Sequence, residues 1–228
     1  MTFCPTPCRS GSEMEGCPLF ADRTQAGQQL AGRLGEYQGR DCVVLALPRG
    51  GVPVALPVAR ALSATLDLLF VRKIGAPHHS EFAIGAVVDG ADPQVVLNDG
   101  LPPQLAAPGG YLDSQVPLLL EEIERRRKTY LGGRAPVDPK GRTVIVVDDG
   151  IATGATMLAG LRGLARLGPA QVVVAVPVAA PEAVERLRDA ADRILCLHMP
   201  GPFRAVGLHY GDFTQVGDAE VVAALGTG

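Results

Sequence analysis

The segment from Asp148 to Thr156 joins two adjacent acids to a run of small and hydroxyl residues, Gly-Ile-Ala-Thr-Gly-Ala-Thr. Small residues let several backbone N–H groups approach one anion, and threonine side chains add hydroxyl donors. An apolar run precedes the segment and a helical pattern follows it, so a helix N-terminus contributes partial positive charge. The pattern predicts a phosphate-binding loop after the two acids, with Thr153 and Thr156 as hydroxyl donors.

Asp148 and Asp149 need partners other than this phosphate, because a carboxylate next to a phosphate repels it. Ribose hydroxyls and a hydrated Mg²⁺ ion are suitable partners. The structural alternative is that the acids cap the following helix and that the glycines only form a tight turn. No lysine follows the loop and no G-x-G-x-x-G follows a strand, so the sequence favours neither a P-loop nucleotidase nor a dinucleotide enzyme.

Two further segments carry cations at the ends of apolar runs. Pro48-Arg49-Gly50-Gly51 offers backbone N–H groups and a forked guanidinium to an anion, or it is simply a turn. Residues 72–80 contain Arg72, Lys73 and two histidines without periodicity, which predicts a loop; a solvated basic loop without function is the plain alternative. The adjacent histidines lack a third metal ligand, so we expect them to be exposed.

Apolar runs alternate with helical patterns along the chain, which predicts a doubly wound α/β fold with a mostly parallel sheet. The expected strands cover residues 42–47, 66–71, 144–147, 171–178 and 193–197, and the expected helices cover 23–37, 52–62, 154–167 and 181–190. Residues 82–88 and 94–97 indicate a hairpin, and residues 112–130 one long helix outside the alternation. Ligands of such sheets bind beyond the carboxyl ends of the strands, where the segments described above stand.

The composition of the chain disfavours several classes of protein. The 228 residues are 47% hydrophobic, carry a formal charge of −3 and contain no block of five or more like charges, which disfavours nucleic-acid binding. The longest uncharged stretch, residues 167–181, is interrupted by prolines and is too short to span a bilayer. Five cysteines without a regular framework fit a reducing cytoplasm. A zinc site at Cys4, Cys8 and Cys17 is the less favoured interpretation.

The run Val-Ile-Val-Val-Asp-Asp-Gly-Ile-Ala-Thr-Gly-Ala-Thr at residues 144–156 resembles the phosphoribosyl pyrophosphate (PRPP) signature of type I phosphoribosyltransferases. Leu-Pro-Arg-Gly-Gly and Val-Arg-Lys-Ile-Gly-Ala-Pro stand where that family has its pyrophosphate loop and its mobile catalytic loop. The chain is most similar to predicted bacterial members of the family, over roughly residues 20–200. We therefore expect a flexible leader at residues 1–18 and a phosphoribosyltransferase-like domain at 19–228, with an added segment at 99–140.

The resemblance implies transfer of a 5-phosphoribosyl group from PRPP to a nitrogen acceptor, a nucleobase or related amine, with release of pyrophosphate. Mg²⁺ would be the cofactor, carried by PRPP and assisted by the two aspartates, which hold the ribose hydroxyls. The implied catalytic residues are Arg72, Lys73, Asp148 and Asp149, with Ala152, Thr153, Gly154, Ala155 and Thr156 on the 5′-phosphate and Arg49 and Gly50 on the pyrophosphate.

Two other functions stay open on the same residues: a non-catalytic protein that senses PRPP or a nucleotide, and a hydrolase that acts on a phosphorylated sugar. The acceptor is not given by the sequence. Ala152 stands where family members that use 6-oxopurines carry an acid, so hypoxanthine and guanine are expected to be poor acceptors. Phe203, Tyr210 and Phe213 in the tail are expected to pack in the core rather than on a base. Small-molecule substrates, a cytoplasmic location and a homodimer complete the expectation.

Overall fold

The computed structural model describes residues 18–77, 79–90, 92–98 and 108–226. Residues 1–17 of the expected leader and residues 99–107 of the expected added segment lie outside the described residues, as does His78. Among the residues that are described, no helix has the length and apolar character needed to cross a membrane.

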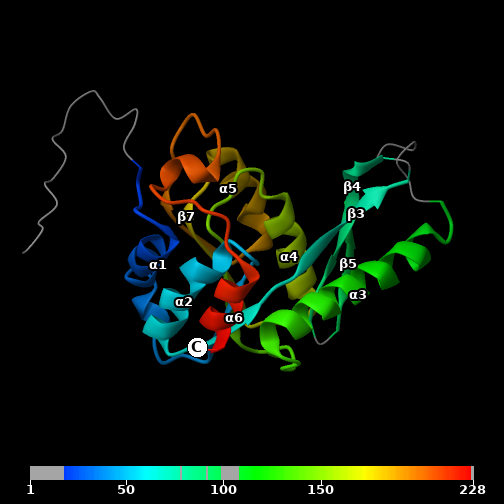
Figure 1. The fold of residues 1–228 in the computed structure, drawn as a ribbon, viewed down its shortest axis with the longest axis horizontal. Helices are drawn as coiled ribbons and strands as arrows, with labels where there is room; N and C mark the ends of the chain where they lie inside the picture. Colours follow the sequence, from blue (N-terminus) through cyan, green and yellow to red (C-terminus); the bar gives the residue numbers. More distant parts are fainter. Residues whose placement is uncertain (1–17, 78, 91, 99–107, 227–228) are drawn as a thin grey trace, which may run out of the picture.

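A five-stranded parallel sheet forms the centre of the molecule, in the order β2-β1-β6-β7-β8 (Figure 1). Its strands are β1 (Cys42–Ala46), β2 (Thr65–Leu68), β6 (Thr143–Val147), β7 (Gln171–Val178) and β8 (Arg193–His198). β1 and β6 are neighbours, with Ala46 opposite Val147 at their carboxyl ends. The chain leaves β1 towards one edge of the sheet and β6 towards the other, so the topological switch point lies between these two strands.

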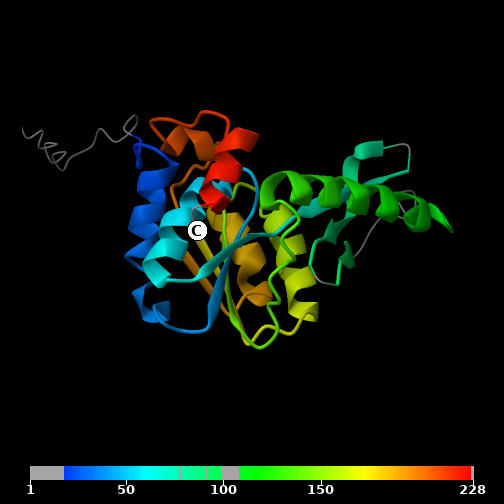
Figure 2. The ribbon, with the colours of Figure 1, turned by 60° about the horizontal axis from the view of Figure 1, so that its bottom comes forward.

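Helices cover both faces of this sheet (Figures 1 and 2). They are α1 (Arg23–Ala31), α2 (Gly51–Leu62) and α6 (Asp218–Gly226) on one face, and α4 (Ala155–Arg166) and α5 (Pro181–Leu187) on the other. Val44 and Ile145 face the first layer, whereas Val43 and Val144 face the second. Because both faces are buried, the strands are near-continuous runs of Val, Leu and Ile.

A second, antiparallel sheet projects from the main body together with α3 (Figures 1 and 2). It contains β3 (Val71–Ala76), β4 (His79–Val88) and β5 (Gln94–Leu97). The helix α3 (Tyr111–Leu131) contacts this sheet and reaches α6 on the main body. It therefore connects the projecting sheet to the helical layer beside the carboxyl end of β1.

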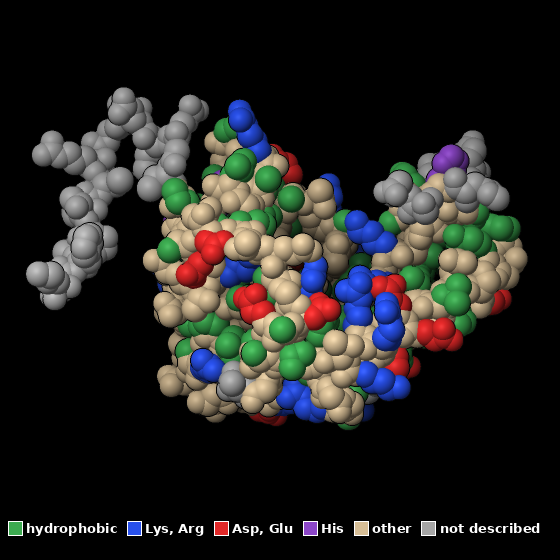
Figure 3. Space-filling view, in the orientation of Figure 1, with side chains coloured by type: hydrophobic (Ala, Val, Ile, Leu, Met, Phe, Trp, Pro, Cys, Tyr) green, Lys and Arg blue, Asp and Glu red, His purple; other side chains and the backbone are tan. Residues whose placement is uncertain are grey.

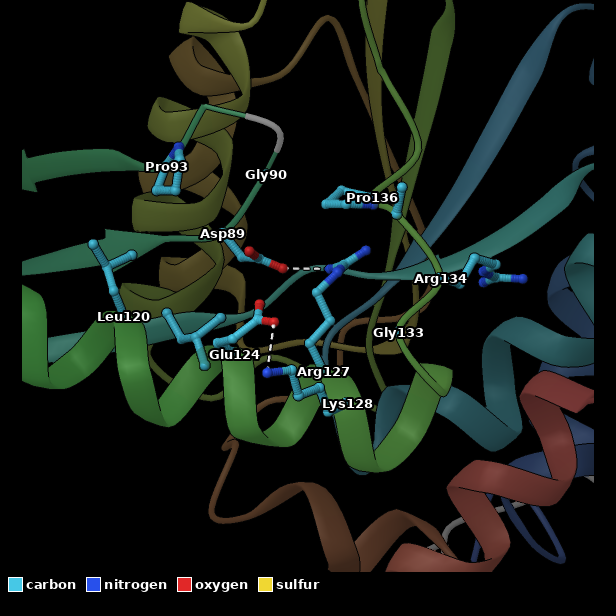
Figure 4. Close-up of a pocket in the computed structure, with 12 residues that line it drawn as sticks. Asp89, Gly90, Pro93, Leu120, Glu124, Arg127, Lys128, Gly133, Arg134 and Pro136 are labelled. Atoms are coloured by element: carbon cyan, nitrogen blue, oxygen red, sulfur yellow. Dashed lines mark hydrogen bonds and ion pairs between the residues drawn. The ribbon is translucent and has the colours of Figure 1, made fainter.

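A buried cluster of charges anchors α3, and Figure 4 shows its pair of Arg127 and Asp89. Arg127 of α3 donates to Asp67 of β2 at 3.0 Å and to Asp89, which follows β4. The backbone N–H of Val137 also donates to Asp67, at 2.8 Å. Burial raises the pKa of Asp89 above its ordinary value, although the contact with Arg127 opposes the shift. The cluster joins α3 and both sheets by charges that have little access to water.

The expected fold class is confirmed, and so are the hairpin and the long helix at 112–130. Two expectations about residues 66–80 are wrong. The single strand expected at 66–71 is divided between two sheets, because the chain passes from β2 to β3 through the core at Leu69 and Phe70. The loop expected at 72–80 is largely strand: Arg72 lies opposite Val87, and a bulge after Ile74 interrupts the regular pairing.

Candidate functional site

The carboxyl ends of β1 and β6 bring the glycine turn and the acidic pair together. The backbone N–H of Leu47 donates to the carbonyl of Val147 at 2.9 Å, which holds the turn beside β6. Gly50 lies directly against Asp149, since a Cβ atom at position 50 would be 2.2 Å from Asp149 Oδ2. A Cβ atom at Gly51 would be 2.7 Å from the carbonyl oxygen of Val147. The two glycines thus allow the turn to pack on the acidic pair.

The two carboxylates are adjacent and partly buried. Asp148 Oδ1 accepts the backbone N–H of Asp149 at 2.9 Å. Burial, and then the neighbouring charge of Asp149, raise the pKa of Asp148 well above its ordinary value. Burial also raises the pKa of Asp149, against the opposing effect of Arg23. Hydroxyl donors or a cation at this pair would stabilise its ionised form.

Arg23, at the start of α1, is a site residue that the sequence did not reveal. Its Nε donates to Asp149 Oδ2 at 2.8 Å, and its Nη1 donates to the carbonyl of Thr214 at 2.9 Å. The guanidinium carbon lies 3.8 Å from the ring centroid of Phe213. Because 126 residues separate Arg23 from Asp149, no local pattern in the sequence indicates this contact.

The segment that follows β8 also contacts the acidic pair, through Tyr210. The hydroxyl of Tyr210 donates to the carbonyl of Asp149 at 2.5 Å, and its ring is buried against Phe20. Burial raises the pKa of Tyr210, so its hydroxyl stays protonated and remains a donor. The core-packing expectation is therefore confirmed for Tyr210. Phe213, by contrast, lines the cavity over the acidic pair.

This cavity has a volume of about 340 Å³ and brings residues from four parts of the chain together. It is lined by Arg23, Arg49, Gly50, Asp148, Asp149, Phe213, Gln215 and Val216. Carboxylates, guanidinium groups and one aromatic ring thus converge on one concave surface. Such a surface suits a polar ligand with hydroxyl groups and a planar portion.

The predicted phosphate loop stands between β6 and α4. Ile151 is tied to the main sheet, donating to the carbonyl of Val178 at 3.0 Å and accepting from Ala180 at 2.8 Å. Beyond it, Ala152 and Thr153 are exposed, and so are the first residues of α4, Ala155 and Thr156. The loop is therefore fixed at its base and open to solvent at a helix N-terminus, as an anion-binding loop requires.

Arg49, Arg72 and Lys73 occupy different places. Arg49 lines the cavity and lies 3.4 Å from Asp218 at the start of α6. Arg72 of β3 pairs with Glu122 of α3 at 3.1 Å, and Lys73 is exposed. Within the described ranges, no hydrogen bond or ion pair joins Arg72 or Lys73 to the acidic pair. The structure therefore brings only Arg49 of these three cations to the carboxylate cavity.

No metal centre made by protein side chains alone is found in the described part of the chain, where no three His, Cys, Asp or Glu groups converge. Cys4, Cys8 and Cys17 lie outside the described residues, as does His78. Cys42 and Cys196 are free thiols.

Comparison with known families agrees with this geometry. The family model described as "Phosphoribosyl transferase domain" matches residues 23–210. The chain belongs to the phosphoribosyltransferase family. The matched range contains the glycine turn, the acidic pair and the phosphate loop, so the resemblance drawn from these segments is confirmed.

Two relatives of this phosphoribosyltransferase chain match most of its length. A protein of Mycobacterium tuberculosis (strain ATCC 25618 / H37Rv), assigned by name to the phosphoribosyl transferases, is 45% identical over 207 residues. These residues are 91% of this chain but 46% of that protein, so the chain spans about half the length of this relative. The crystal structure of TT1426 from Thermus thermophilus is 46% identical, with a TM-score of 0.77, and covers 90% of this chain and 97% of that one.

A shorter match extends to an enzyme named for its acceptor. A uracil phosphoribosyltransferase of Streptomyces avermitilis is 36% identical over 100 residues, which are 39% of this chain and 47% of that enzyme. The family is one of transferases, and the match to TT1426 supports the doubly wound α/β fold.

Proposed function

We propose that this protein transfers a 5-phosphoribosyl group from PRPP to a nitrogen acceptor and releases pyrophosphate. The observation that carries the proposal is the packing of Gly50 on Asp149 beside the open loop at 152–156. A sugar between two phosphate-type groups fits this arrangement, because carboxylates that can accept sugar hydroxyls stand between a glycine turn and a loop that both offer backbone N–H groups. In the reaction the bond from C1 to the diphosphate oxygen breaks, a bond from C1 to the acceptor nitrogen forms, and the acceptor loses a proton.

The acidic pair has the chemistry to hold the ribose hydroxyls. Each carboxylate accepts hydrogen bonds, and hydroxyl donors from a bound sugar would favour the ionised form of Asp148, opposing the burial that raises its pKa. Negative charge near C1 also stabilises the oxocarbenium-like transition state of this reaction. Arg23 acts through Asp149, whose carboxylate it orients.

The donors at the site also fit Mg²⁺, which takes oxygen ligands and keeps several waters. Asp149 is already paired with Arg23, so Asp148 is the carboxylate that we assign to a hydrated ion. Mg²⁺ supplies charge neutralisation at the departing diphosphate when it is bound. The protein residues supply orientation, through the acidic pair, and anion contacts, through Arg49 and the backbone of Gly50.

The experiment is pyrophosphate release from PRPP and Mg²⁺ with a panel of acceptors. Uracil is included because a relative over part of the chain is a uracil enzyme. Adenine, small amines, hypoxanthine and guanine complete the panel, and we expect the two 6-oxopurines to be poor because Ala152 has no acid–base group. Acceptor-dependent release is the expected outcome. Release without an acceptor would indicate a hydrolase, and PRPP binding without release would indicate a sensor.

A binding measurement separates the phosphate loop from the rest of the site. Thr153→Val removes a hydroxyl donor from the exposed part of the loop. PRPP and ribose 5-phosphate both carry the 5′-phosphate, so calorimetry is expected to show equal weakening of the two ligands. Unchanged affinity for both would remove the loop from the proposed site.

A further inference from the structure

A second hollow, of about 230 Å³, opens between α3 and α6 next to the glycine turn. It is lined by Arg49, Arg125, Arg126, Thr129, Tyr130 and Asp218. Three of these residues are cations and one is an acid. Figure 3 shows Lys and Arg side chains gathered over the middle of α3, where this helix adjoins the main body.

The positive charge of the hollow is only partly balanced. Arg126 shares Glu122 with Arg72, at 3.1 Å from each. Arg125 is exposed and makes no ion pair with a described residue. Arg72, which shares Glu122 with Arg126, has a buried Nε without a hydrogen-bond partner among the described groups. Burial, and then the charge of Arg126, lower the pKa of Arg72. An anion in the hollow would relieve this repulsion.

The hollow adjoins the carboxylate cavity at one shared residue, Arg49. Arg49 lines both spaces, on one side with Asp148 and Asp149, and on the other with the α3 arginines. A group on a sugar at the acidic pair can therefore contact Arg49, the residue that also faces the hollow. A diphosphate matches the charge of several guanidinium groups, which bind phosphate oxygens in forked pairs.

We propose that this hollow holds the diphosphate of PRPP, and pyrophosphate after transfer, with Arg125 and Arg126 as donors. The inference rests on the proposed function for its substrate. It assigns to α3 a charge-stabilising role that the family resemblance implied for Arg72 and Lys73. In this protein Arg72 is committed to Glu122, and Lys73 faces solvent.

The test measures, by titration calorimetry, how tightly the parent and four variants bind each of three ligands. The ligands are PRPP with Mg²⁺, pyrophosphate with Mg²⁺, and ribose 5-phosphate. The variants are Arg125→Gln, Arg126→Gln, the double variant, and Lys128→Gln as a matched control. The control removes the same charge from the same helix, but Lys128 is exposed, pairs with Glu124 at 3.6 Å and does not line the hollow. Thermal unfolding of each variant checks that the fold is intact.

We expect Arg125→Gln to weaken the binding of PRPP and of pyrophosphate roughly tenfold, because charge-assisted hydrogen bonds to phosphate oxygens are strong. The double variant should weaken the binding of both ligands roughly a hundredfold. Ribose 5-phosphate, which lacks the diphosphate, should bind all variants equally, and Lys128→Gln should match the parent throughout. Arg125→Gln is the cleanest variant because it breaks no ion pair with a described residue.

Two failures are distinguishable. If the parent binds PRPP and both arginine variants bind it equally well, the inference about α3 is wrong while the proposed function stands. If the parent binds pyrophosphate but not PRPP, the proposed function is wrong, and loss of pyrophosphate in the double variant still supports a diphosphate site. Equal weakening of PRPP and ribose 5-phosphate would mean that the variants disturb the whole site, which also overturns the inference.

Discussion

Asp148 is an acidic residue that folding places directly beside a second acid, Asp149. Its pKa is raised in the folded protein above the ordinary value of 3.8, first by burial and then by Asp149. The folded state therefore holds the proton more tightly than the unfolded state does. As pH rises above this ordinary value, the free energy of unfolding falls until the carboxyl is ionised in both states.

Asp148→Asn is therefore expected to be more stable than the parent at neutral pH, and to bind PRPP more weakly. The asparagine oxygen can still accept the N–H of Asp149, so only the charge is lost. A gain of about 1 kcal/mol raises the Tm of a domain of this size by roughly 2–4 °C. Thermal unfolding from pH 3.5 to 8 measures the effect. The gain should disappear at the acid end, and a variant less stable than the parent at pH 7 would contradict the argument.

Gly50 provides a steric test of the glycine turn. Its backbone is helical, with φ −59° and ψ −35°, so alanine can adopt it, yet the added Cβ would lie 2.2 Å from Asp149 Oδ2. We expect Gly50→Ala to weaken PRPP binding at least about tenfold, equivalent to roughly 1.4 kcal/mol, because the turn or the carboxylate must move. Gly35→Ala is the matched control, because a Cβ atom added there would have no described atom within 4 Å apart from its chain neighbours. If Gly50→Ala and the parent bind PRPP with equal affinity in calorimetry, the close packing of residue 50 on Asp149 is not needed for binding.

At the scale of elements, Arg127 determines how α3 is held. Removing it leaves Asp67 and Asp89 buried without their common partner. We expect Arg127→Ala to lower the free energy of unfolding by about 3–5 kcal/mol, as is typical when one member of a buried ion pair is lost. Lys128→Ala on the exposed side of the same helix should cost less than about 1 kcal/mol. Urea unfolding measures both, and similar losses would mean that the buried cluster contributes little.

The elements also show where sequence patterns suffice. Parallel strands such as β6 and β7 are recognisable because burial on both faces makes them uniformly apolar. The same uniformity conceals the passage from β2 to β3, since an apolar run that crosses the core has no period to interrupt. The residues of β3 predict a loop because its partner strand and its bulge, rather than its own sequence, determine its structure.

The candidate site, too, has parts that the sequence predicts and parts that it does not. The acidic pair, the glycine turn and the phosphate loop are local patterns, and the structure places the first two in contact. Arg23 reaches the acidic pair, and the α3 arginines reach the neighbouring hollow, only through tertiary packing between residues far apart in the sequence. Arginine is common on exposed helix surfaces, so no local pattern distinguishes these arginines from solvated charges.

For the whole molecule, ligand binding is expected to shift the global unfolding transition. PRPP with Mg²⁺ should raise the Tm more than ribose 5-phosphate does, because ligands that bind only the folded state stabilise it in proportion to their occupancy. Removing Mg²⁺ with EDTA should abolish the additional shift from PRPP and leave that of ribose 5-phosphate unchanged. An identical PRPP shift with and without Mg²⁺ would argue against an ion carried by the diphosphate. The homodimer stays a prediction, which sedimentation equilibrium would measure.

The contact of Asp218 with Arg49 and Tyr130 has a kinetic consequence. Its carboxylate accepts the Tyr130 hydroxyl at 2.7 Å and lies 3.4 Å from Arg49, so a tethered anion already stands in the arginine hollow. A diphosphate entering that hollow must compete with it, and the carboxylate can return as pyrophosphate departs. Asp218→Asn is therefore expected to bind pyrophosphate more tightly and to release it more slowly in stopped-flow measurements. Weaker binding would instead mean that Asp218 holds Arg49 in position. As a competitor built into α6, this carboxylate would keep the product from inhibiting the protein that made it.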